Sequence, residues 1–272
     1  MPDVTEPSRL ETLLALCVTC GASDLHLSAG LPPYLRLHGS LRPVEHAGPV
    51  TPGELRRMAE GMVLGDLNEG LNRTGSVDGA MTSAGGTRFR FNIFRRQNDL
   101  SIAMRRLEDR LHTLTELGLS ELLYEVCDQS HGLVVVAGPT GSGKSTTLAA
   151  LVDRVNQTHR SHIITIEDPI EYLHKPALSL VNQRQIGPDA SSFNEALVAA
   201  LRQDPDVVLV GEIRELNTIR TAITAAETGH LVLTTVHAGD CVGTIERLVS
   251  VFPADEQVGV RRQLALVLRW VI

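Results

Sequence analysis

Residues 138–145 read G-P-T-G-S-G-K-S, and residues 133–137 immediately before them read L-V-V-V-A. A short β-branched apolar run therefore leads into a glycine-rich turn. The next residues, T-T-L-A-A at 146–150, are typical of the start of a helix. This succession of strand, loop and helix is the context that a phosphate-binding P-loop requires. Because glycine adopts backbone angles that side chains forbid, the loop can direct several N–H groups at one anion, at the positive end of the helix.

The loop predicts a binding site for a nucleoside triphosphate with Mg²⁺. Lys144 would reach the β- and γ-phosphates, and the Ser145 hydroxyl would bind Mg²⁺. An ordinary glycine turn is the alternative, but the spacing and the flanking pattern both favour the P-loop. The residues expected to contact the nucleotide here are Gly138, Pro139, Thr140, Gly141, Ser142, Gly143, Lys144, Ser145 and Thr146.

Length and composition favour a globular protein of about two domains. The chain has 272 residues, a net charge of −7, and 3% aromatic residues. The acidic balance and the scarcity of aromatic side chains argue against a nucleic-acid partner. No apolar run approaches the ~20 residues needed to span a bilayer, and no basic segment precedes an apolar run at the start of the chain. These features favour a cytoplasmic protein.

Four cysteines are present, and two of them form a C-x-x-C. Cys17 and Cys20 have no second pair at the spacing of a zinc site. Because they lie among leucines in an expected helix, we interpret them as two small apolar residues on a buried face rather than a metal or redox pair.

The first half of the chain predicts a small α+β domain with an antiparallel sheet. Residues 9–20 and 52–64 have helical patterns, and Gly85-Gly86 is typical of a hairpin turn between two strands. The segments that favour strands are 24–28, 34–38, 76–82, 87–95 and 100–107. We expect this domain to span residues 1–110, with a linker near residues 108–116.

The second half, residues 111–272, alternates apolar strands with helices. Such alternation predicts an α/β domain with a mainly parallel sheet that is covered on both faces. The expected strands are 133–137, 162–166, 207–210 and 231–236. The expected helices are 119–129, the P-loop helix to residue 156, 194–203, 215–227, 243–251 and 254–272.

Carboxylates follow two of the apolar strands. Glu212 ends the stretch D-V-V-L-V-G-E, and Glu167 and Asp168 close I-T-I-E-D. Ligands of open α/β sheets bind at the carboxyl ends of the strands, where a carboxylate can orient a water or hold Mg²⁺. We therefore assign Glu212 and Glu167 to catalysis and to the metal, together with Ser145. The competing interpretation is a solvated carboxylate after a strand, which applies more strongly to Glu171.

Two histidines flank the strand at 231–236. His230 precedes it and His237 follows it, and an imidazole near a γ-phosphate can sense or stabilise that group. We predict a catalytic role for His230 and a nucleotide contact for His237. The alternative for each is a structural histidine whose ring is hydrogen bonded within the fold.

Arginines crowd the last strands of the first half. Phosphoryl transfer gains from a guanidinium that arrives from another domain, and we assign this role to Arg90 and Arg105. The alternative is that these side chains are simply solvated on the face of an edge sheet.

Several motifs occur in one order that resembles a known family. They are the P-loop, I-T-I-E-D-P-I-E-Y (164–172), L-V-N-Q-R-Q (180–185), F-N-E-A-L (193–197), R-Q-D-P-D-V-V-L-V-G-E-I-R (202–214) and T-A-A-E-T-G-H-L-V-L-T-T-V-H (224–237). Together they resemble the secretion ATPases of type II and type IV pilus systems. With G-A-S-D-L-H-L-S-A-G-L-P-P (21–33) and F-R-F-N-I-F (89–94), the chain is similar to the PilT-type retraction ATPases in particular.

The resemblance implies a RecA-like ATPase core preceded by a PAS-like domain. It also implies a homo-hexameric ring that hydrolyses ATP with Mg²⁺ and moves pilins through an inner-membrane platform protein, acting on the pilus fibre indirectly. By motif, Gly138–Ser145 is the Walker A loop, and Glu212 is the catalytic carboxylate that ends the Walker B strand. Glu167 then falls in an acidic box, the two histidines in a histidine box, and Arg90 and Arg105 among arginines that close on the phosphates.

The ring is expected at the inner face of the cytoplasmic membrane. The chain begins directly at the PAS-like domain and lacks a tetracysteine insertion, which favours retraction over assembly. It ends at Ile272, within an expected helix, where relatives continue further. Two other functions remain open at this point: a non-hydrolysing ATP-binding partner of an active paralogue, and a nucleic-acid translocase. The intact Lys144 and Glu212 disfavour the first, and the acidic composition disfavours the second.

Overall fold

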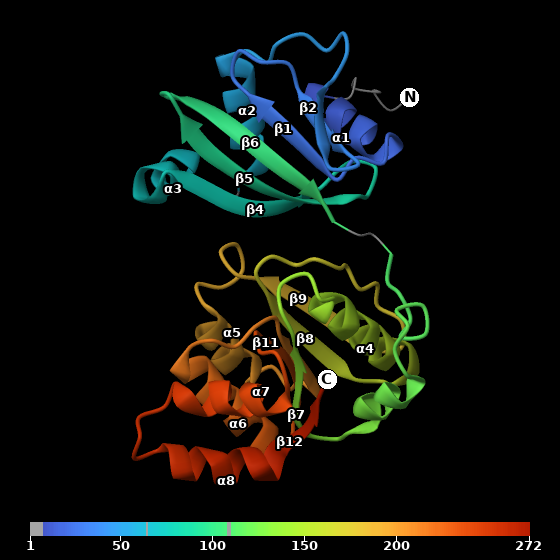
Figure 1. Ribbon diagram of the computed structural model, residues 1–272, viewed down its shortest axis with the longest axis vertical. Helices are drawn as coiled ribbons and strands as arrows, with labels where there is room; N and C mark the ends of the chain where they lie inside the picture. The colour runs from blue at the N-terminus through green and yellow to red at the C-terminus, as the bar shows by residue number, and fades with distance from the viewer. Residues whose placement is uncertain (1–7, 64, 108–109) are drawn as a thin grey trace. The chain divides into compact units, whose positions relative to one another are not determined.

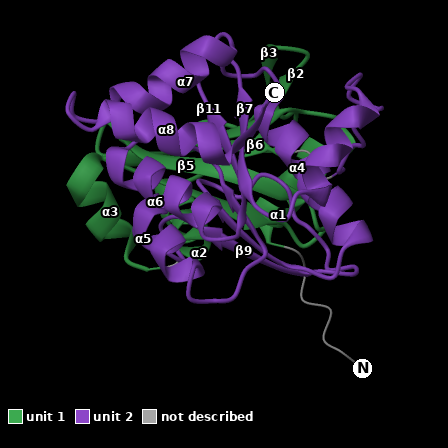
Figure 2. Cartoon of the chain, turned by 90° about the horizontal axis from the view of Figure 1, so that it is seen from below, with its two compact units in different colours: residues 1–109 green, residues 110–272 purple. Residues whose placement is uncertain are grey.

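A computed structural model describes residues 8–63, 65–107 and 110–272 (Figure 1). The chain divides into two compact units, residues 1–109 and 110–272, which are coloured green and purple in Figure 2. Part of the expected linker, residues 108–109, and the expected helix end at residue 64 lie outside the described residues.

The first unit contains a six-stranded antiparallel sheet in the order β3-β2-β1-β6-β5-β4. The hairpin predicted at Gly85-Gly86 is confirmed, since the Ser83 N–H donates to the Thr87 carbonyl oxygen at 2.8 Å between β4 and β5. The strands are β1 (Asp24–Ser28), β2 (Tyr34–Leu37), β3 (Ser40–Pro43), β4 (Ser76–Thr82), β5 (Arg88–Arg96) and β6 (Asp99–Arg106).

Among the described residues of this unit, three helices accompany the sheet: α1 (Arg9–Thr19), α2 (Pro52–Met62) and α3 (Leu67–Thr74). Leu14 of α1 and Leu55 of α2 share one fully buried core with Phe89 of β5, so the two helices cover one face of the sheet. Helix α2 begins at a capping box in which Thr51 and Glu54 exchange side-chain and backbone hydrogen bonds. Cys17 is buried in this core as predicted. Cys20, at the C-terminal end of α1, is exposed, which contradicts the prediction for this residue.

The second unit is built on a six-stranded parallel sheet in the order β12-β7-β11-β10-β8-β9. Its strands are β7 (Gly132–Ala137), β8 (His162–Glu167), β9 (Leu180–Gln185), β10 (Val207–Val210), β11 (Leu231–Val236) and β12 (Leu268–Val271). Its helices are the 3₁₀ helix η1 (Glu121–Asp128), α4 (Lys144–Thr158), α5 (Phe193–Ala200), α6 (Leu216–Glu227), α7 (Cys241–Ser250) and α8 (Gln257–Val267).

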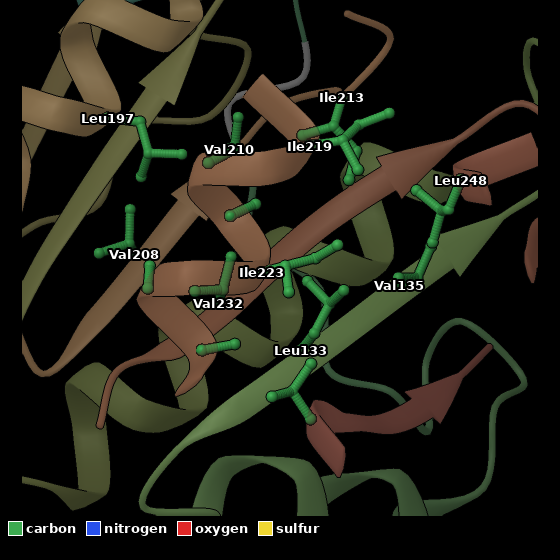
Figure 3. Packing of buried hydrophobic residues seen from close by; sticks show 14 of the residues in the cluster. Leu133, Val135, Leu197, Val208, Val210, Ile213, Ile219, Ile223, Val232 and Leu248 are labelled. Atoms are coloured by element: carbon green, nitrogen blue, oxygen red, sulfur yellow. The ribbon is translucent and has the colours of Figure 1, made fainter. Parts of the chain in front are cut away.

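Helices cover both faces of this parallel sheet. Leu151 of α4 packs with Val134 and Leu233 on one face, while α5 to α8 cover the other. Figure 3 shows the hydrophobic core on the face covered by α5 to α8, in which Ile219 and Ile223 of α6 lie among side chains of the central strands. A sheet covered on both faces explains the continuous apolar runs of β7, β10 and β11. The predicted fold class, an α/β core preceded by an α+β domain, is confirmed.

Five elements differ from the expectation. Residues 268–271 form the strand β12 rather than the end of a helix, because the backbone of this segment pairs with the edge of β7. The Ile272 N–H donates to the Val135 carbonyl oxygen at 2.9 Å. The prediction also missed β3, β9 and α3, which are short or polar, and the segment at 119–129 forms a 3₁₀ helix over 121–128.

Candidate nucleotide-binding site

The P-loop connects the carboxyl end of β7 to the amino end of α4. Gly138, Gly141 and Gly143 have φ values of +156°, +79° and +96°, which favour glycine. A Cβ at Gly138 would lie 2.5 Å from the Ser142 Oγ and 3.2 Å from its Cβ. No side chain caps α4, whose N-cap is Gly143. The N–H groups of its first turn therefore face the loop, as an anion site requires.

Lys144 is the first residue of α4, and its side chain folds back over the loop. Its ammonium donates to the Pro139 carbonyl oxygen at 2.8 Å, and the residue is only 9% exposed. A buried ammonium at the end of a glycine-rich loop provides the point charge that binds a β- or γ-phosphate.

The predicted acidic residues meet this loop because all strands of the sheet run in parallel. Strand β11 lies between β7 and β10, so the P-loop, His237 and Glu212 follow three adjacent strands at one edge. A small cavity of about 30 Å³, large enough for a water molecule, lies under α4 at this edge. It is lined by Ser145, Leu148, Ala149, Glu167, Tyr172, His174, Leu209, Gly211 and Thr235.

Glu167 is the last residue of β8, and two side chains donate to one of its oxygens. The Thr165 hydroxyl donates to Glu167 Oε1 at 2.7 Å, and the Gln183 amide donates to the same atom at 3.2 Å. Burial raises the pKa of Glu167, while these hydrogen bonds and one from the Glu171 backbone act to lower it. A nearby cation would stabilise the charged form of this carboxylate and so offset the cost of its burial.

Glu212 follows Gly211 at the end of β10 and faces two basic side chains. The Arg214 guanidinium lies 2.7 Å from Glu212 Oε2, and His237 Nε2 lies 3.9 Å from the same oxygen. Burial, Lys144 and Arg214 lower the pKa of His237 against the opposing effect of Glu212, so this imidazole is neutral at pH 7. At Gly211 a Cβ would make a tight contact of 3.3 Å with the Ile166 carbonyl oxygen.

Comparisons with known proteins agree with this geometry. Residues 79–270 match the model of the family described as "Type II/IV secretion system protein". The chain belongs to this family. It is 44% identical over 270 residues to the "Type IV pilus retractation ATPase PilT" of Pseudomonas aeruginosa, covering 99% of this chain and 76% of that protein.

Two solved structures are similar as well. A crystal structure of the pilus retraction motor PilT with bound ADP matches with a TM-score of 0.91 and 43% identity, covering 98% of this chain and 77% of that one. The ATPase DotB of Legionella pneumophila matches with a TM-score of 0.86 and 26% identity, covering 98% and 77%.

In this family member, His230 does not reach the P-loop of its own chain. It precedes β11 and therefore lies at the amino edge of the sheet, whereas the loop lies at the carboxyl edge. Its Nδ1 is 3.0 Å from the Ala225 carbonyl oxygen. The six residues of β11 place about 20 Å between the two edges. Within one chain the imidazole contacts the C-terminal end of α6 rather than the P-loop, and the catalytic role of His230 stays a prediction.

Arg90 and Arg105 lie in the first unit as direct cross-strand neighbours on β5 and β6. Arg105 Nε donates to Asp24 Oδ1 at 3.0 Å, and both arginines are exposed. Their contact with phosphates stays a prediction.

Several site residues were not predicted from the sequence. Thr235 donates to the Gly211 carbonyl oxygen at 2.6 Å, which ties β11 to the turn before Glu212. The Tyr172 hydroxyl lies 3.0 Å from Thr146 Oγ1, and the buried His174 lines the cavity. The only available signal was position, since Thr235 lies at the end of a strand beside the P-loop strand.

The residues present fit Mg²⁺. Ser145 and Glu167 line the same cavity and Glu212 lies on the neighbouring strand, so a hydroxyl and two carboxylates meet at one edge. Beside a nucleotide, Mg²⁺ is usually bound by a small number of oxygen ligands of this kind. The Glu167 carboxylate supports the same conclusion, because burial raises its pKa and a nearby cation would stabilise its charged form.

Proposed function

We propose that this chain is an ATP-hydrolysing motor subunit that powers type IV pilus retraction or a related pilus-type secretion step. The observation that carries the proposal is the convergence of an intact P-loop with Glu212 at one edge of the parallel sheet. Its 44% identity to a pilus retraction ATPase over nearly the whole chain supports retraction as the task.

Each residue of the site has a distinct part in hydrolysis. Lys144 and the backbone N–H groups of residues 140–146 bind the phosphates, and Ser145, Glu167 and Glu212 hold Mg²⁺ directly or through water. Bound Mg²⁺ supplies charge neutralisation at the phosphate oxygens. Glu212 orients the attacking water and accepts its proton.

Two further groups act on the γ-phosphate in this proposal. His237, neutral at pH 7 and 3.9 Å from Glu212, donates or accepts one hydrogen bond and so senses whether the phosphate is present. Arg90 and Arg105 neutralise the charge that develops during transfer, as guanidinium groups do in other phosphoryl-transfer enzymes.

The working assembly is a homo-hexamer at the inner face of the cytoplasmic membrane, where it acts on a platform protein and through it on the pilus fibre. Among the residues that the structure describes, no helix combines the length and apolar composition required to cross a bilayer.

The role of Glu212 is tested by Glu212→Gln. This change keeps the side-chain shape but removes the base, so the ATPase rate should fall by a factor of about 100 or more while nucleotide affinity stays within about twofold. Steady-state phosphate release and titration with a fluorescent ATP analogue measure the two quantities.

Glu215→Gln is the matched control, because Glu215 is exposed three residues further along the chain and its side chain caps nothing. It should hydrolyse ATP at the wild-type rate. Normal turnover in Glu212→Gln would show that Glu212 is not the water-orienting carboxylate.

A further inference from the structure

Residues 170–179 form an irregular segment that runs from β8 to β9; we call it the strap. It is hydrogen bonded to α4 at two places. The Tyr172 hydroxyl lies 3.0 Å from Thr146 Oγ1, next to the P-loop, and Asn156 Nδ2 donates to the Lys175 carbonyl oxygen at 2.8 Å further along the helix. The strap is therefore fixed relative to the P-loop helix.

Gln183 of β9 joins this strap to Glu167. Its amide oxygen accepts from the His174 N–H at 2.8 Å, and its Nε2 donates to the Tyr172 carbonyl oxygen at 2.8 Å and to Glu167 Oε1 at 3.2 Å. A glutamine amide has two N–H donors and one oxygen. The two strap contacts fix which way the amide points, so its remaining N–H is directed at the carboxylate.

The register between β8 and β9 places Gln183 within hydrogen-bonding distance of Glu167. Gln183 pairs directly with Thr165 across β8 and β9, and the Thr165 hydroxyl donates to the same oxygen of Glu167 at 2.7 Å. Thr165 approaches along the strand that carries Glu167, and Gln183 approaches from the neighbouring strand. Two donors from different directions on one oxygen restrict rotation of the carboxylate about its side-chain torsions.

We propose that Gln183 is a positioning residue that holds the Glu167 carboxylate toward the metal of the Mg²⁺–nucleotide complex. The inference rests on the proposed function, since it assumes that Glu167 serves that metal. The groups that hold metal-binding carboxylates commonly set metal affinity as strongly as some ligands do.

The test removes the amide of Gln183 but keeps a side chain of similar size, so that no cavity is left. Gln183→Met has a side chain of similar length with no donor, so it should weaken Mn²⁺ binding to the protein–ADP complex by a factor of about 10 to 100. Mn²⁺ affinity is measured by the electron paramagnetic resonance signal of free Mn²⁺. ADP affinity in EDTA should stay within about twofold of wild type, because the P-loop is unchanged.

Asn182→Leu is the matched control. Asn182 is an exposed amide on the adjacent position of β9, where successive side chains point to opposite faces, and its Nδ2 contacts His162 rather than Glu167. This variant should bind Mn²⁺ as wild type does. Fluorescence of Trp270, the chain's one tryptophan, on β12 beside β7, reports whether each variant keeps the second unit folded.

Thr165→Val provides a second route if Gln183→Met does not fold. It removes the other donor to Glu167 Oε1 at nearly constant volume, and it should weaken Mn²⁺ binding in the same direction while ADP binding in EDTA is preserved. Unchanged Mn²⁺ affinity in the folded variants would overturn the inference, as would a wild-type protein–ADP complex that binds Mn²⁺ no more tightly than ADP alone.

Failure of the inference and failure of the proposed function give different results. If wild type hydrolyses ATP and Gln183→Met binds Mn²⁺ normally, only the positioning role is wrong. If Gln183→Met weakens Mn²⁺ binding but the wild type does not hydrolyse ATP, the positioning role stands and the motor function is wrong.

Discussion

Gly138 is the residue at which the P-loop depends most on the absence of a side chain. Its φ of +156° would strain any other residue, and an added Cβ would meet Ser142 Oγ at 2.5 Å. The Ser142 hydroxyl can rotate away, but its Cβ at 3.2 Å cannot. We therefore expect Gly138→Ala to distort the loop and lower nucleotide affinity at least about tenfold, a loss of about 1.4 kcal/mol or more.

Titration with a fluorescent ATP analogue measures this loss. Gly187→Ala is the control, because Gly187 has a φ of +98° in the turn after β9 but no atom within 4 Å of an added Cβ. It carries similar backbone strain outside the loop and should bind nucleotide normally. Equal affinity in Gly138→Ala and wild type would contradict the role given to this glycine.

His174 makes the stability of the second unit depend on pH. Burial lowers the pKa of this imidazole from 6.5 to about 4, and its Nδ1 has no hydrogen-bond partner among the described residues. The folded state therefore favours the neutral ring, and its stabilisation is complete above pH 6.5 and is lost as the pH falls toward 4. The free energy of unfolding should fall by about 3 kcal/mol over this range on account of His174.

His174→Gln isolates this contribution, since glutamine stays neutral at every pH. Urea unfolding followed by Trp270 fluorescence between pH 7 and pH 4 should show a shallower decline for the variant than for wild type. Parallel declines for the two proteins would mean that His174 does not titrate in this range.

Asn156 holds the strap to α4. The residue is fully buried, and its amide donates to the Lys175 carbonyl oxygen at 2.8 Å and accepts from the Ala177 N–H at 3.0 Å. Asn156→Ala leaves these two backbone groups without their partner, and we expect a loss of about 2–4 kcal/mol in the free energy of unfolding.

Urea unfolding of the second unit, again followed by Trp270 fluorescence, measures this loss. Gln157→Ala, at the next position of α4 and exposed, should change stability by less than about 0.5 kcal/mol. A comparable loss in both variants would attribute the effect to the helix itself rather than to the strap.

The sequence predicts best what is local. The P-loop and the strands β7, β10 and β11 follow from contiguous patterns, because each is defined by its own residues. Strand β9 and its Gln183 were missed, since L-V-N-Q-R-Q has no apolar run and becomes a strand only by pairing with the edge of β8. The role of Gln183 depends on a partner 16 residues away.

One wrong prediction and one unexpected position show how tertiary structure overrides a pattern. Residues 268–271 continue the apolar pattern of a helix, yet they pair with β7 because that edge would otherwise leave its backbone groups without partners. His230 was assigned by proximity in sequence to β11. In a parallel sheet the residue before a strand lies at the edge opposite the ligand, so strand direction alone would have placed His230 away from the P-loop of its own chain. Its catalytic role stays a prediction.

For the molecule as a whole, the proposed task makes a prediction about filaments. A retraction motor removes subunits from a pilus, so deletion of its gene in the source organism should leave more surface filaments, and these should be immobile. Counting filaments by electron microscopy, with and without a plasmid that restores the gene, measures the effect. A strain without filaments would indicate an assembly motor instead.

The most direct test of the nucleotide site compares wild type with Lys144→Ala in calorimetric titrations with a non-hydrolysable ATP analogue and Mg²⁺. Loss of a charge-assisted contact of about 1.5–3 kcal/mol should weaken binding by a factor of about 10 to 100. Trp270 fluorescence checks that the second unit of the variant is folded. Equal affinity of the two folded proteins, or no binding by wild type, would contradict the assignment of residues 138–145 as the phosphate-binding loop.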